Sequence, residues 1–214
     1  MIQAVIFDMD GVLFDTERLG VGQQVQACRE LGYPIDVSLV MLTMGSSMAA
    51  GKEIFLRELG ADFPYDRMIG RWTELMLEYM NTNGVPKKSG VPEVLDALKV
   101  RGIKTAVATS NNQEIVESYM RSAGLTGAFS AVVCGDRIQK SKPAPDIYLA
   151  AAAALNVSPS CCMGVEDSEN GVRAVRAAGM VCVMVPDLLP FSPALSPYVD
   201  HCAETLHGIL PILS

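Results

Sequence analysis

The sequence predicts an α/β protein with a doubly wound, mostly parallel sheet and a separate helical unit inserted into it. Short apolar runs alternate with helical patterns at the spacing of β-α-β units. The first of these runs, Ala4–Phe7, is apolar along its whole length, which is typical of a strand buried on both faces. One stretch of about 65 residues behind the first run shows only helical periodicity. Together these observations predict two parts of different architecture.

The composition is that of a folded chain with a large core. The protein has 214 residues (22.9 kDa), of which 50% are hydrophobic and 19% charged, and this balance excludes global disorder. No apolar run is long enough to span a membrane, and the N-terminus lacks the basic residues of a signal peptide. The six cysteines form no CxxC pair, so we expect a reducing, cytoplasmic location.

The predicted strands and helices alternate along the chain. The first strand is Ala4–Phe7, and four later runs share its character, namely Ile103–Ala108, Ala131–Cys134, Cys161–Val165 and Val181–Val185. The helical patterns between them are Val91–Val100, Gln113–Ala123, Asp146–Leu155 and Ser168–Ala178. Two of these helices carry start signals, because Pro92 lies in a first turn and Ser168 is a capping residue. A proline-rich segment after the last strand predicts a loop before a short final element.

The inserted helical unit is predicted to span residues 16–84, which leaves residues 1–15 and 85–214 for the sheet domain. Its helical patterns are Val21–Leu31, Ser47–Leu59 and Asp66–Asn81. Glycine and proline residues separate these patterns, as expected for turns between helices.

Asp8 and Asp10 directly follow the first predicted strand, at the edge where open α/β sheets bind ligands. Two carboxylates so close repel each other unless a cation binds or one of them is protonated. In such a pair, one carboxylate can act as nucleophile while its neighbour transfers protons. The alternative is a turn without chemistry, because the dipeptide Asp10-Gly11 is common in turns.

Three later segments also place polar residues near predicted strand ends. Thr109–Asn111 offers a hydroxyl and backbone N–H groups for phosphate oxygens, or it only caps a helix. Lys142 precedes a helix start that is marked by prolines. It is either a residue of the site or part of a solvated loop. Glu166 and Asp167 end another apolar run, or they form an acidic cap that the helix dipole favours.

The carboxyl ends of parallel strands share one edge of a sheet, so we expect these acids, the hydroxyl and the lysine to meet. The two histidines, His201 and His207, both lie near the C-terminus, so the site offers only oxygen ligands. Oxygen ligands suit Mg²⁺ rather than zinc. The net charge is −7, and an anionic substrate would need local positive charge from a metal ion or a lysine.

In this order, the segments resemble the haloacid dehalogenase (HAD) superfamily, in the branch of β-phosphoglucomutase and small-molecule phosphatases. The four motifs are Asp8-Met-Asp10-Gly-Val-Leu-Phe-Asp15-Thr-Glu17, Thr109, Lys142 in Lys-Pro-Ala-Pro-Asp, and Gly164-Val-Glu166-Asp167-Ser168. They follow the family's order over nearly the whole chain. The resemblance implies a Rossmann-like core domain and makes the helical insert a cap domain.

The resemblance also implies a role for each acidic residue of the motifs. Asp8 would be the nucleophile that forms an aspartyl-phosphate. Asp10 would protonate the leaving oxygen and then activate water. Mg²⁺ would be held by Asp8, the backbone carbonyl of Asp10, and Asp167, with Glu166 as a ligand or a supporting residue.

The phosphoryl group would be held by residues of the second and third motifs. The resemblance assigns this role to Thr109 and Lys142, together with the backbone N–H groups of Ser110 and Asn111. The assignment agrees with the chemistry, because phosphoryl transfer depends mainly on positioning and on neutralising the charge of the phosphoryl oxygens.

Within the family, the sequence favours hydrolysis over phosphomutase chemistry. Sequences similar to β-phosphoglucomutase carry a histidine in the linker to the cap, where this chain has Gly20. They also carry basic residues around a cap glycine, which hold the second phosphate, where this chain has Met44 and Met48 beside Gly45. Other basic residues of the insert could still reach the site, namely Lys52, Arg57, Arg67 and Arg71.

We therefore expect Mg²⁺-dependent hydrolysis of a small phosphate monoester, a sugar or polyol phosphate. Neither nucleic acid nor a membrane is expected as a partner, because the 17 Lys and Arg residues are scattered, and the resemblance permits a monomer. The nearest alternative is a phosphomutase of the β-phosphoglucomutase type. A less favoured alternative is a non-catalytic phospho-acceptor, like a response-regulator receiver, or a binding protein on the HAD scaffold.

Overall fold

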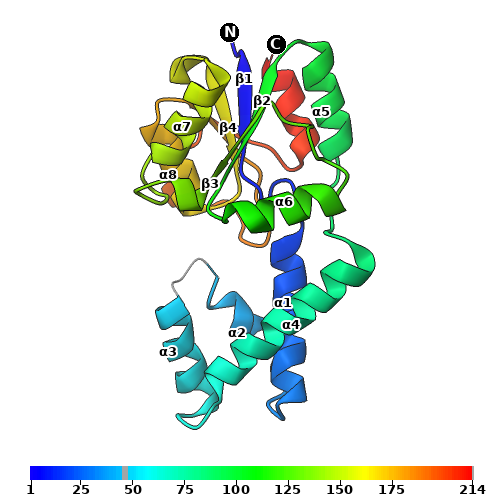
Figure 1. Cartoon of the computed structure of the whole chain (residues 1–214). Helices are drawn as coiled ribbons and strands as arrows, with labels where there is room; N and C mark the ends of the chain where they lie inside the picture. Colours follow the sequence, from blue (N-terminus) through cyan, green and yellow to red (C-terminus); the bar gives the residue numbers. More distant parts are fainter. Residues whose placement is uncertain (45–47, 214) are drawn as a thin grey trace. The chain divides into compact units, whose positions relative to one another are not determined.

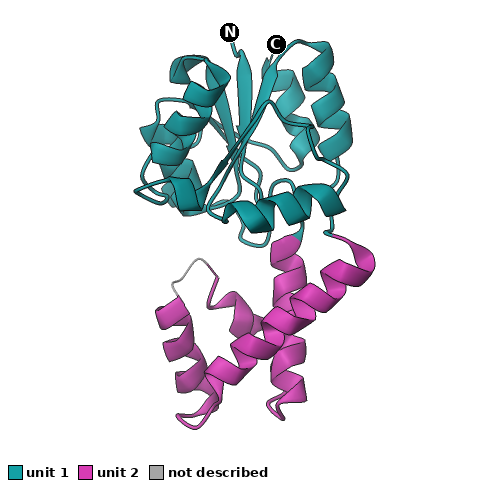
Figure 2. Ribbon diagram, in the orientation of Figure 1, with its two compact units in different colours: residues 1–15, 85–214 teal, residues 16–84 magenta. Residues whose placement is uncertain are grey.

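The structure, a computed structural model, describes residues 1–44 and 48–213. It divides into two compact units, one of residues 1–15 and 85–214 and one of residues 16–84 (Figure 2). Gly45, which the sequence comparison with phosphomutases singles out, lies outside the described residues.

In the first unit, the described strands form one sheet in the order β3-β2-β1-β4-β5-β6, and all neighbours pair in parallel. The strands are β1 (Ala4–Phe7), β2 (Lys104–Thr109), β3 (Ala131–Cys134), β4 (Cys162–Glu166), β5 (Val181–Met184) and β6 (His201–Cys202). β1 lies near the centre between β2 and β4, and all four of its residues are buried, which accounts for its apolar sequence. The predicted α/β class is confirmed, and the described sheet is parallel throughout.

Helices cover both faces of this sheet (Figure 1). The helices of the unit are α5 (Val91–Val100), α6 (Gln113–Ser122), α7 (Asp146–Leu155) and α8 (Glu169–Ala177). α7 and α8 pack on one face, and α5 packs on the other beside the C-terminal 3₁₀ segment Leu206–Leu213. Ser168 caps α8 as predicted, since its hydroxyl accepts a hydrogen bond from the N–H of Gly171 at 3.1 Å.

The second unit consists of helices, namely α1 (Thr16–Glu30), α2 (Val37–Met41), α3 (Met48–Leu59) and α4 (Tyr65–Asn83). α1 and α4 pack against each other, and the indole N–H of Trp72 donates to the carbonyl oxygen of Gly20 at 2.9 Å. Aromatic rings form part of the core of this unit, where Phe55 stacks on Phe63 with ring centroids 5.5 Å apart.

Three local features differ from the sequence-based expectation. α1 begins at Thr16 rather than at Val21, so the helix starts directly after the first motif. The sequence does not predict α2, a short helix at whose start the side chain of Asp36 accepts a hydrogen bond from the N–H of Ser38. It also does not predict β6, which consists of two exposed residues and exists only through its pairing with β5.

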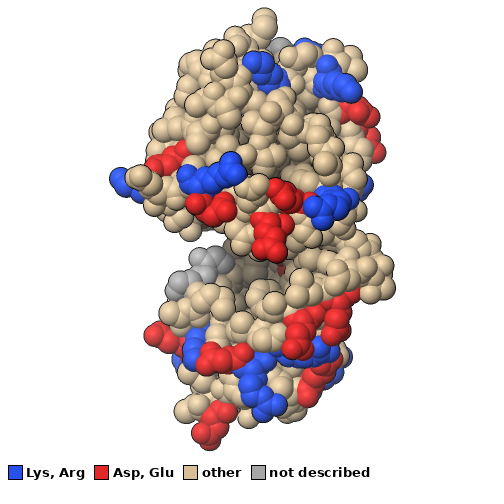
Figure 3. All heavy atoms as spheres, viewed as in Figure 1, with Lys and Arg blue, Asp and Glu red and all other residues tan. Residues whose placement is uncertain are grey.

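None of the helices in the described residues is both long and apolar enough to cross a membrane. On the face drawn in Figure 3, basic and acidic side chains alternate over each unit.

Parallel pairing brings the carboxyl ends of β1, β2 and β4 to one edge of the sheet. Asp8 follows the last residue of β1, while Thr109 and Glu166 are the last residues of β2 and β4. The chain therefore places polar residues from the first, second and fourth motifs at this edge.

Candidate active site

Asp8 occupies the first position after β1 and remains tied to the sheet. Its backbone N–H donates to the carbonyl oxygen of Val165 in β4 at 2.9 Å, and its side chain is nearly buried. The loop that follows turns sharply at Gly11, whose φ is +78°. A Cβ at Gly11 would lie 2.1 Å from Oδ2 of Asp167. Only glycine therefore allows the carboxylate of Asp167 to approach this loop so closely.

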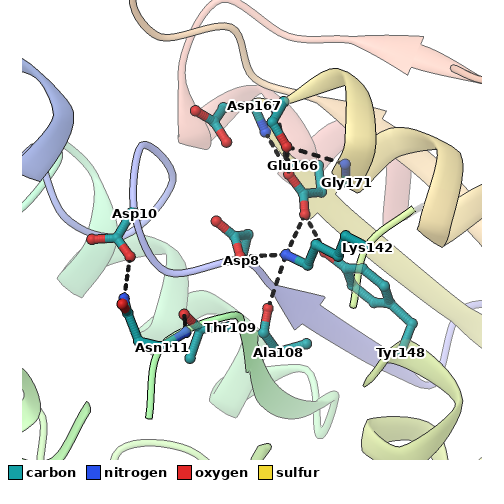
Figure 4. A network of polar contacts seen from close by, with 11 residues as sticks. Asp8, Asp10, Ala108, Thr109, Asn111, Lys142, Tyr148, Glu166, Asp167 and Gly171 are labelled. Atoms are coloured by element: carbon teal, nitrogen blue, oxygen red, sulfur yellow. Dashed lines mark hydrogen bonds and ion pairs between the residues drawn. The ribbon is translucent and has the colours of Figure 1, made fainter. Parts of the chain in front are cut away.

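Lys142 reaches the same point from the loop before α7. Its Nζ lies 2.5 Å from Oδ1 of Asp8 and 2.6 Å from Oε1 of Glu166, and it also donates to the carbonyl oxygen of Ala108 at 3.2 Å (Figure 4). The lysine side chain is only 8% exposed, so these ion pairs lie in a largely dry environment. Lys142 does lie in a loop, but the alternative of a solvated loop is wrong, since its ammonium is buried among the acids.

Glu166 is completely buried and accepts hydrogen bonds on both carboxylate oxygens. Oε1 accepts from Lys142 and from the hydroxyl of Tyr148, the latter at 2.7 Å. Oε2 accepts from the hydroxyl of Ser168 at 3.0 Å and from the backbone N–H groups of Asp167 and Ser168 at 3.2 and 3.3 Å. The carboxylate is thus held by donors from the loop before α7, from α7 and from the turn between β4 and α8.

The acids of the site fit a divalent cation. Asp8, Glu166 and Asp167 each offer a carboxylate oxygen, and these three atoms lie within 4.8 Å of one another. All three side chains are buried, and the set contains only hard oxygen donors. Such a set suits Mg²⁺. The close approach of Asp167 that Gly11 permits belongs to this arrangement.

Burial raises the pKa of Asp8 to about 7, even though the neighbouring ammonium of Lys142 lowers it. The negative charges of Glu166 and Asp10 also raise the pKa of Asp8, and the value of about 7 is the net result of all these effects. For Lys142, burial lowers the pKa, but Asp8 and Glu166 raise it more, so the net shift is upward. The lysine therefore stays charged, and additional positive charge at the site would favour the ionised form of Asp8.

The residues predicted to hold phosphate also lie at this edge. Thr109 is almost completely buried, and its Oγ1 accepts a hydrogen bond from the backbone N–H of Asn111 at 3.2 Å. The side chain of Asn111 donates to Oδ2 of Asp10 at 2.6 Å. Ser110 lies between them and is exposed. Figure 4 shows Thr109 and Asn111 on the opposite side of Asp8 from Glu166.

Three contacts of the site are not predictable from the sequence. Tyr148 binds Glu166, Asn111 binds Asp10 through its side-chain amide, and Gly171 packs on Glu166. A Cβ at Gly171 would lie 1.8 Å from Cδ of Glu166. The only sequence signal for Gly171 is its position three residues after the capping Ser168, and Tyr148 gives no signal within its apolar helix.

A parallel sheet that gathers buried acids, a lysine and a hydroxyl at its carboxyl edge defines a class, the α/β enzymes that transfer phosphoryl groups. The chain belongs to one family of this class, the haloacid dehalogenase-like hydrolases, whose family model matches residues 5–185. It lies in the branch similar to β-phosphoglucomutase, and it is an enzyme, a HAD-type phosphoric monoester hydrolase.

Two relatives and one solved structure illustrate the similarity. The phosphorylated carbohydrates phosphatase of Thermotoga maritima is 34% identical over 183 residues, which cover 84% of this chain and 82% of that protein. The β-phosphoglucomutase of Bacillus subtilis is 31% identical over 192 residues, with 86% and 83% covered. A HAD family hydrolase from Deinococcus radiodurans R1, with bound phosphate and sodium, superposes with a TM-score of 0.84 at 27% identity, with 98% and 93% covered. The chain is accordingly a phosphatase of small phosphorylated substrates.

Proposed function

We propose that the protein is a Mg²⁺-dependent phosphatase that hydrolyses a sugar or polyol phosphate through an aspartyl-phosphate on Asp8. The observation that carries this proposal is the contact of Lys142 with Asp8 beside the buried oxygen cluster of Asp8, Glu166 and Asp167. A nucleophilic carboxylate, a fixed positive charge and a set of cation ligands meet there. The name of the Thermotoga maritima relative supports a carbohydrate phosphate as substrate.

The reaction proceeds in two displacements at phosphorus. A carboxylate oxygen of Asp8 attacks the phosphorus atom, and the bond from phosphorus to the leaving oxygen breaks. Asp10 gives its proton to that oxygen, so the alcohol departs and Asp8 carries the phosphoryl group. Asp10 then takes a proton from water, whose oxygen attacks the phosphorus and releases inorganic phosphate and ionised Asp8.

Asn111 orients Asp10 for its two proton transfers. Its amide donates to Oδ2 of Asp10, so that oxygen acts as an acceptor and the transferable proton resides on Oδ1. Thr109, Lys142 and the N–H groups of Ser110 and Asn111 hold the phosphoryl oxygens. The N–H of Asn111 exchanges its bond to Thr109 for one to the ligand.

The residues that would hold Mg²⁺ are Asp8, Asp167 and the backbone carbonyl of Asp10, with Glu166 as a ligand or a supporting residue. When bound, the ion supplies positive charge that offsets the repulsion between Asp8 and the substrate dianion. Lys142, which binds both Asp8 and Glu166, contributes a second positive charge.

Hydrolysis is favoured over mutase chemistry by the contacts of Gly20. A Cβ at Gly20 would lie 3.5 Å from Cζ2 of Trp72, an ordinary contact, but a longer side chain would meet the indole ring. The place of the phosphomutase histidine is therefore occupied by Trp72. A phosphomutase must hold both phosphate groups of a bisphosphate. Gly20 has no side chain that could bind the second phosphate group.

The basic side chains of the helical unit also favour hydrolysis. Three of the four that could bind a second phosphate form ion pairs within their own unit, namely Lys52 with Asp66, Arg57 with Glu58, and Arg71 with Glu30, Glu74 and Glu78. We further propose that residues 16–84 act as a cap domain for the core of residues 1–15 and 85–214, and that the cap selects the substrate.

The test is a phosphate-release screen of the purified protein with Mg²⁺ over a panel of phosphate monoesters. We expect release from a few related sugar or polyol phosphates, its loss in EDTA and its return with added Mg²⁺. Activity that persists in chelator would contradict the metal assignment, and hydrolysis of none of the esters would refute the phosphatase. Conversion of β-glucose 1-phosphate into glucose 6-phosphate without free phosphate would establish the mutase instead, an outcome that the similarity to a β-phosphoglucomutase makes worth measuring.

A further inference from the structure

Tyr148 is a buried polar group for which the proposed reaction has no role. It is the third residue of α7 and has no exposed surface. Its hydroxyl donates to Oε1 of Glu166 at 2.7 Å. In this contact the hydroxyl is the donor, because the carboxylate oxygen of Glu166 can only accept.

The carboxylate that Tyr148 contacts is the partner of Lys142. Oε1 of Glu166 is shared by the hydroxyl of Tyr148 and by Nζ of Lys142, which lies 2.6 Å away. Oε2 is held separately by the start of α8 through Ser168. Among the described residues, Tyr148 is thus the donor that the structure gives for Oε1 besides Lys142, and it lies in α7 two residues after the third motif ends at Asp146.

Tyr148 also contacts the lysine itself. Nζ of Lys142 lies 5.2 Å from the centroid of the tyrosine ring, within the range of a cation–π interaction (Figure 4). A lysine has a flexible four-carbon stem, and holding its ammonium in one place costs side-chain entropy. The ring and the carboxylate together limit where that ammonium can go before a ligand arrives.

We propose that Tyr148 is a positioning residue for phosphate recognition, whose hydroxyl orients Glu166 and whose ring confines Lys142, so that the ammonium is preset toward the phosphoryl group. This inference rests on the proposed function, because it assigns Lys142 to the phosphoryl group. It predicts that Tyr148 controls the affinity for phosphate more than the affinity for Mg²⁺, because its hydroxyl shares Oε1 of Glu166 with Lys142, whereas Oε2 is held separately by Ser168.

The test is Tyr148→Phe, which keeps the ring and removes only the hydroxyl. Binding of inorganic phosphate is measured by calorimetry, both in metal-free protein and at saturating Mg²⁺, and the half-saturating Mg²⁺ concentration is measured separately. We expect phosphate affinity to fall about tenfold in both states, because a hydrogen bond to a charged group is lost. The half-saturating Mg²⁺ concentration should change by less than about threefold, a smaller effect than one such bond.

The matched control is Tyr198→Phe. Tyr198 lies in the same unit and also has a cation over its ring, since Cζ of Arg173 lies 4.2 Å from the ring centroid. Its hydroxyl has no site carboxylate as partner, so phosphate affinity should stay at the wild-type value. An equal loss in both variants would overturn the proposal. So would a lower unfolding temperature of Tyr148→Phe with unchanged phosphate affinity, or a change confined to Mg²⁺.

A second variant covers the case in which Tyr148→Phe does not fold. Glu166→Gln removes the charge that links the hydroxyl to Lys142, and it should weaken phosphate binding at least as much. Wild-type phosphate affinity in that variant would overturn the proposal. The wild-type protein tests the proposed function independently: binding of phosphate without hydrolysis of any ester would refute the phosphatase and leave the assignment of Tyr148 standing.

Discussion

Asp8 shows how opposing influences meet on one side chain. Burial and two neighbouring acids favour its neutral form, while Lys142 at 2.5 Å favours the charged form, and the balance leaves its pKa at about 7. A nucleophile must be ionised to attack phosphorus. The site therefore needs more positive charge than the lysine alone provides, which is the physical reason to expect a cation beside Asp8.

Replacing Asp8 by asparagine should abolish turnover without unfolding the protein. The amide has the shape of the carboxylate but cannot attack phosphorus, so we expect kcat to fall by about 10⁴-fold or more. Phosphate release and circular dichroism measure the two effects. The control is Asp96→Asn, an exposed acid of α5, which should keep full activity. Substantial turnover in Asp8→Asn would show that another group is the nucleophile.

Binding of Mg²⁺ should release protons near neutral pH. The folded, metal-free protein has a pKa of about 7 for Asp8, above the ordinary value of 3.8, so Asp8 is partly protonated at pH 7. The raised pKa means that the contribution of Asp8 to the stability of the metal-free protein decreases as pH rises through this range. Mg²⁺ requires the ionised carboxylate, so its affinity should increase between about pH 6 and pH 8.

Calorimetric titration with Mg²⁺ at several pH values, in buffers of different ionisation enthalpy, measures this proton release. A Mg²⁺ affinity that is independent of pH over the same range would contradict the raised pKa of Asp8.

At the scale of the elements, the junction of β4 and α8 shapes the site. Glu166 ends the strand, Ser168 caps the helix, and the two side chains are hydrogen-bonded at 3.0 Å. The hydroxyl of Ser168 accepts from the N–H of Gly171 in turn. The first turn of α8 can pack onto the carboxylate only because residue 171 has no side chain. The same residues therefore determine both where α8 begins and how the carboxylate of Glu166 is held.

Replacing Gly171 by alanine should damage both stability and activity. The new methyl group would overlap Glu166, which cannot move without losing its donors, so we expect a loss of about 2 kcal/mol in unfolding free energy. Activity should fall more than tenfold, since Lys142 depends on Glu166. Chemical denaturation and phosphate release provide the measurements.

The control for this substitution is Gly70→Ala in α4, where a Cβ would meet nothing within 4 Å. At that position the unfolding free energy should increase by about 0.5–1 kcal/mol, because alanine favours a helix more than glycine does. Equal effects at positions 70 and 171 would show that close packing on Glu166 is not the cause.

At the scale of the whole molecule, the chain passes between its two units at residues 15–16 and 84–85. On the core side, the two passing segments are hydrogen-bonded to each other, since the N–H of Asp15 donates to the carbonyl oxygen of Pro86 at 2.8 Å. Lys88 ties them to the loop after β5, because its Nζ lies 2.6 Å from Oδ1 of Asp187 and 3.6 Å from Asp15. The side chain of Asp187 is only 1% exposed. The two segments that lead to residues 16–84 are thus tied to each other and to the loop after β5 where they leave the core unit.

Lys88→Met should destabilise the core unit by about 3 kcal/mol, because it removes one partner of the ion pair with the buried carboxylate of Asp187. Thermal and chemical unfolding measure this loss. The control is Lys52→Met, which breaks an exposed pair with Asp66 and should cost less than about 1 kcal/mol. Similar losses in the two variants would contradict the structural importance of the buried pair.

The sequence was sufficient to predict the α/β class, the main strands and the residues that meet at the carboxyl edge of the sheet. Apolar periodicity and the four motifs are local signals, and parallel pairing then brings the motifs together. The sequence did not predict β6, α2 or the contacts of Tyr148, Asn111 and Gly171. These features depend on contacts between residues far apart in the chain, or they have no sequence pattern that would predict them. Only folding shows that an apolar helix turns a tyrosine hydroxyl toward Glu166, because the partner of a buried donor is set by packing and not by neighbours in sequence.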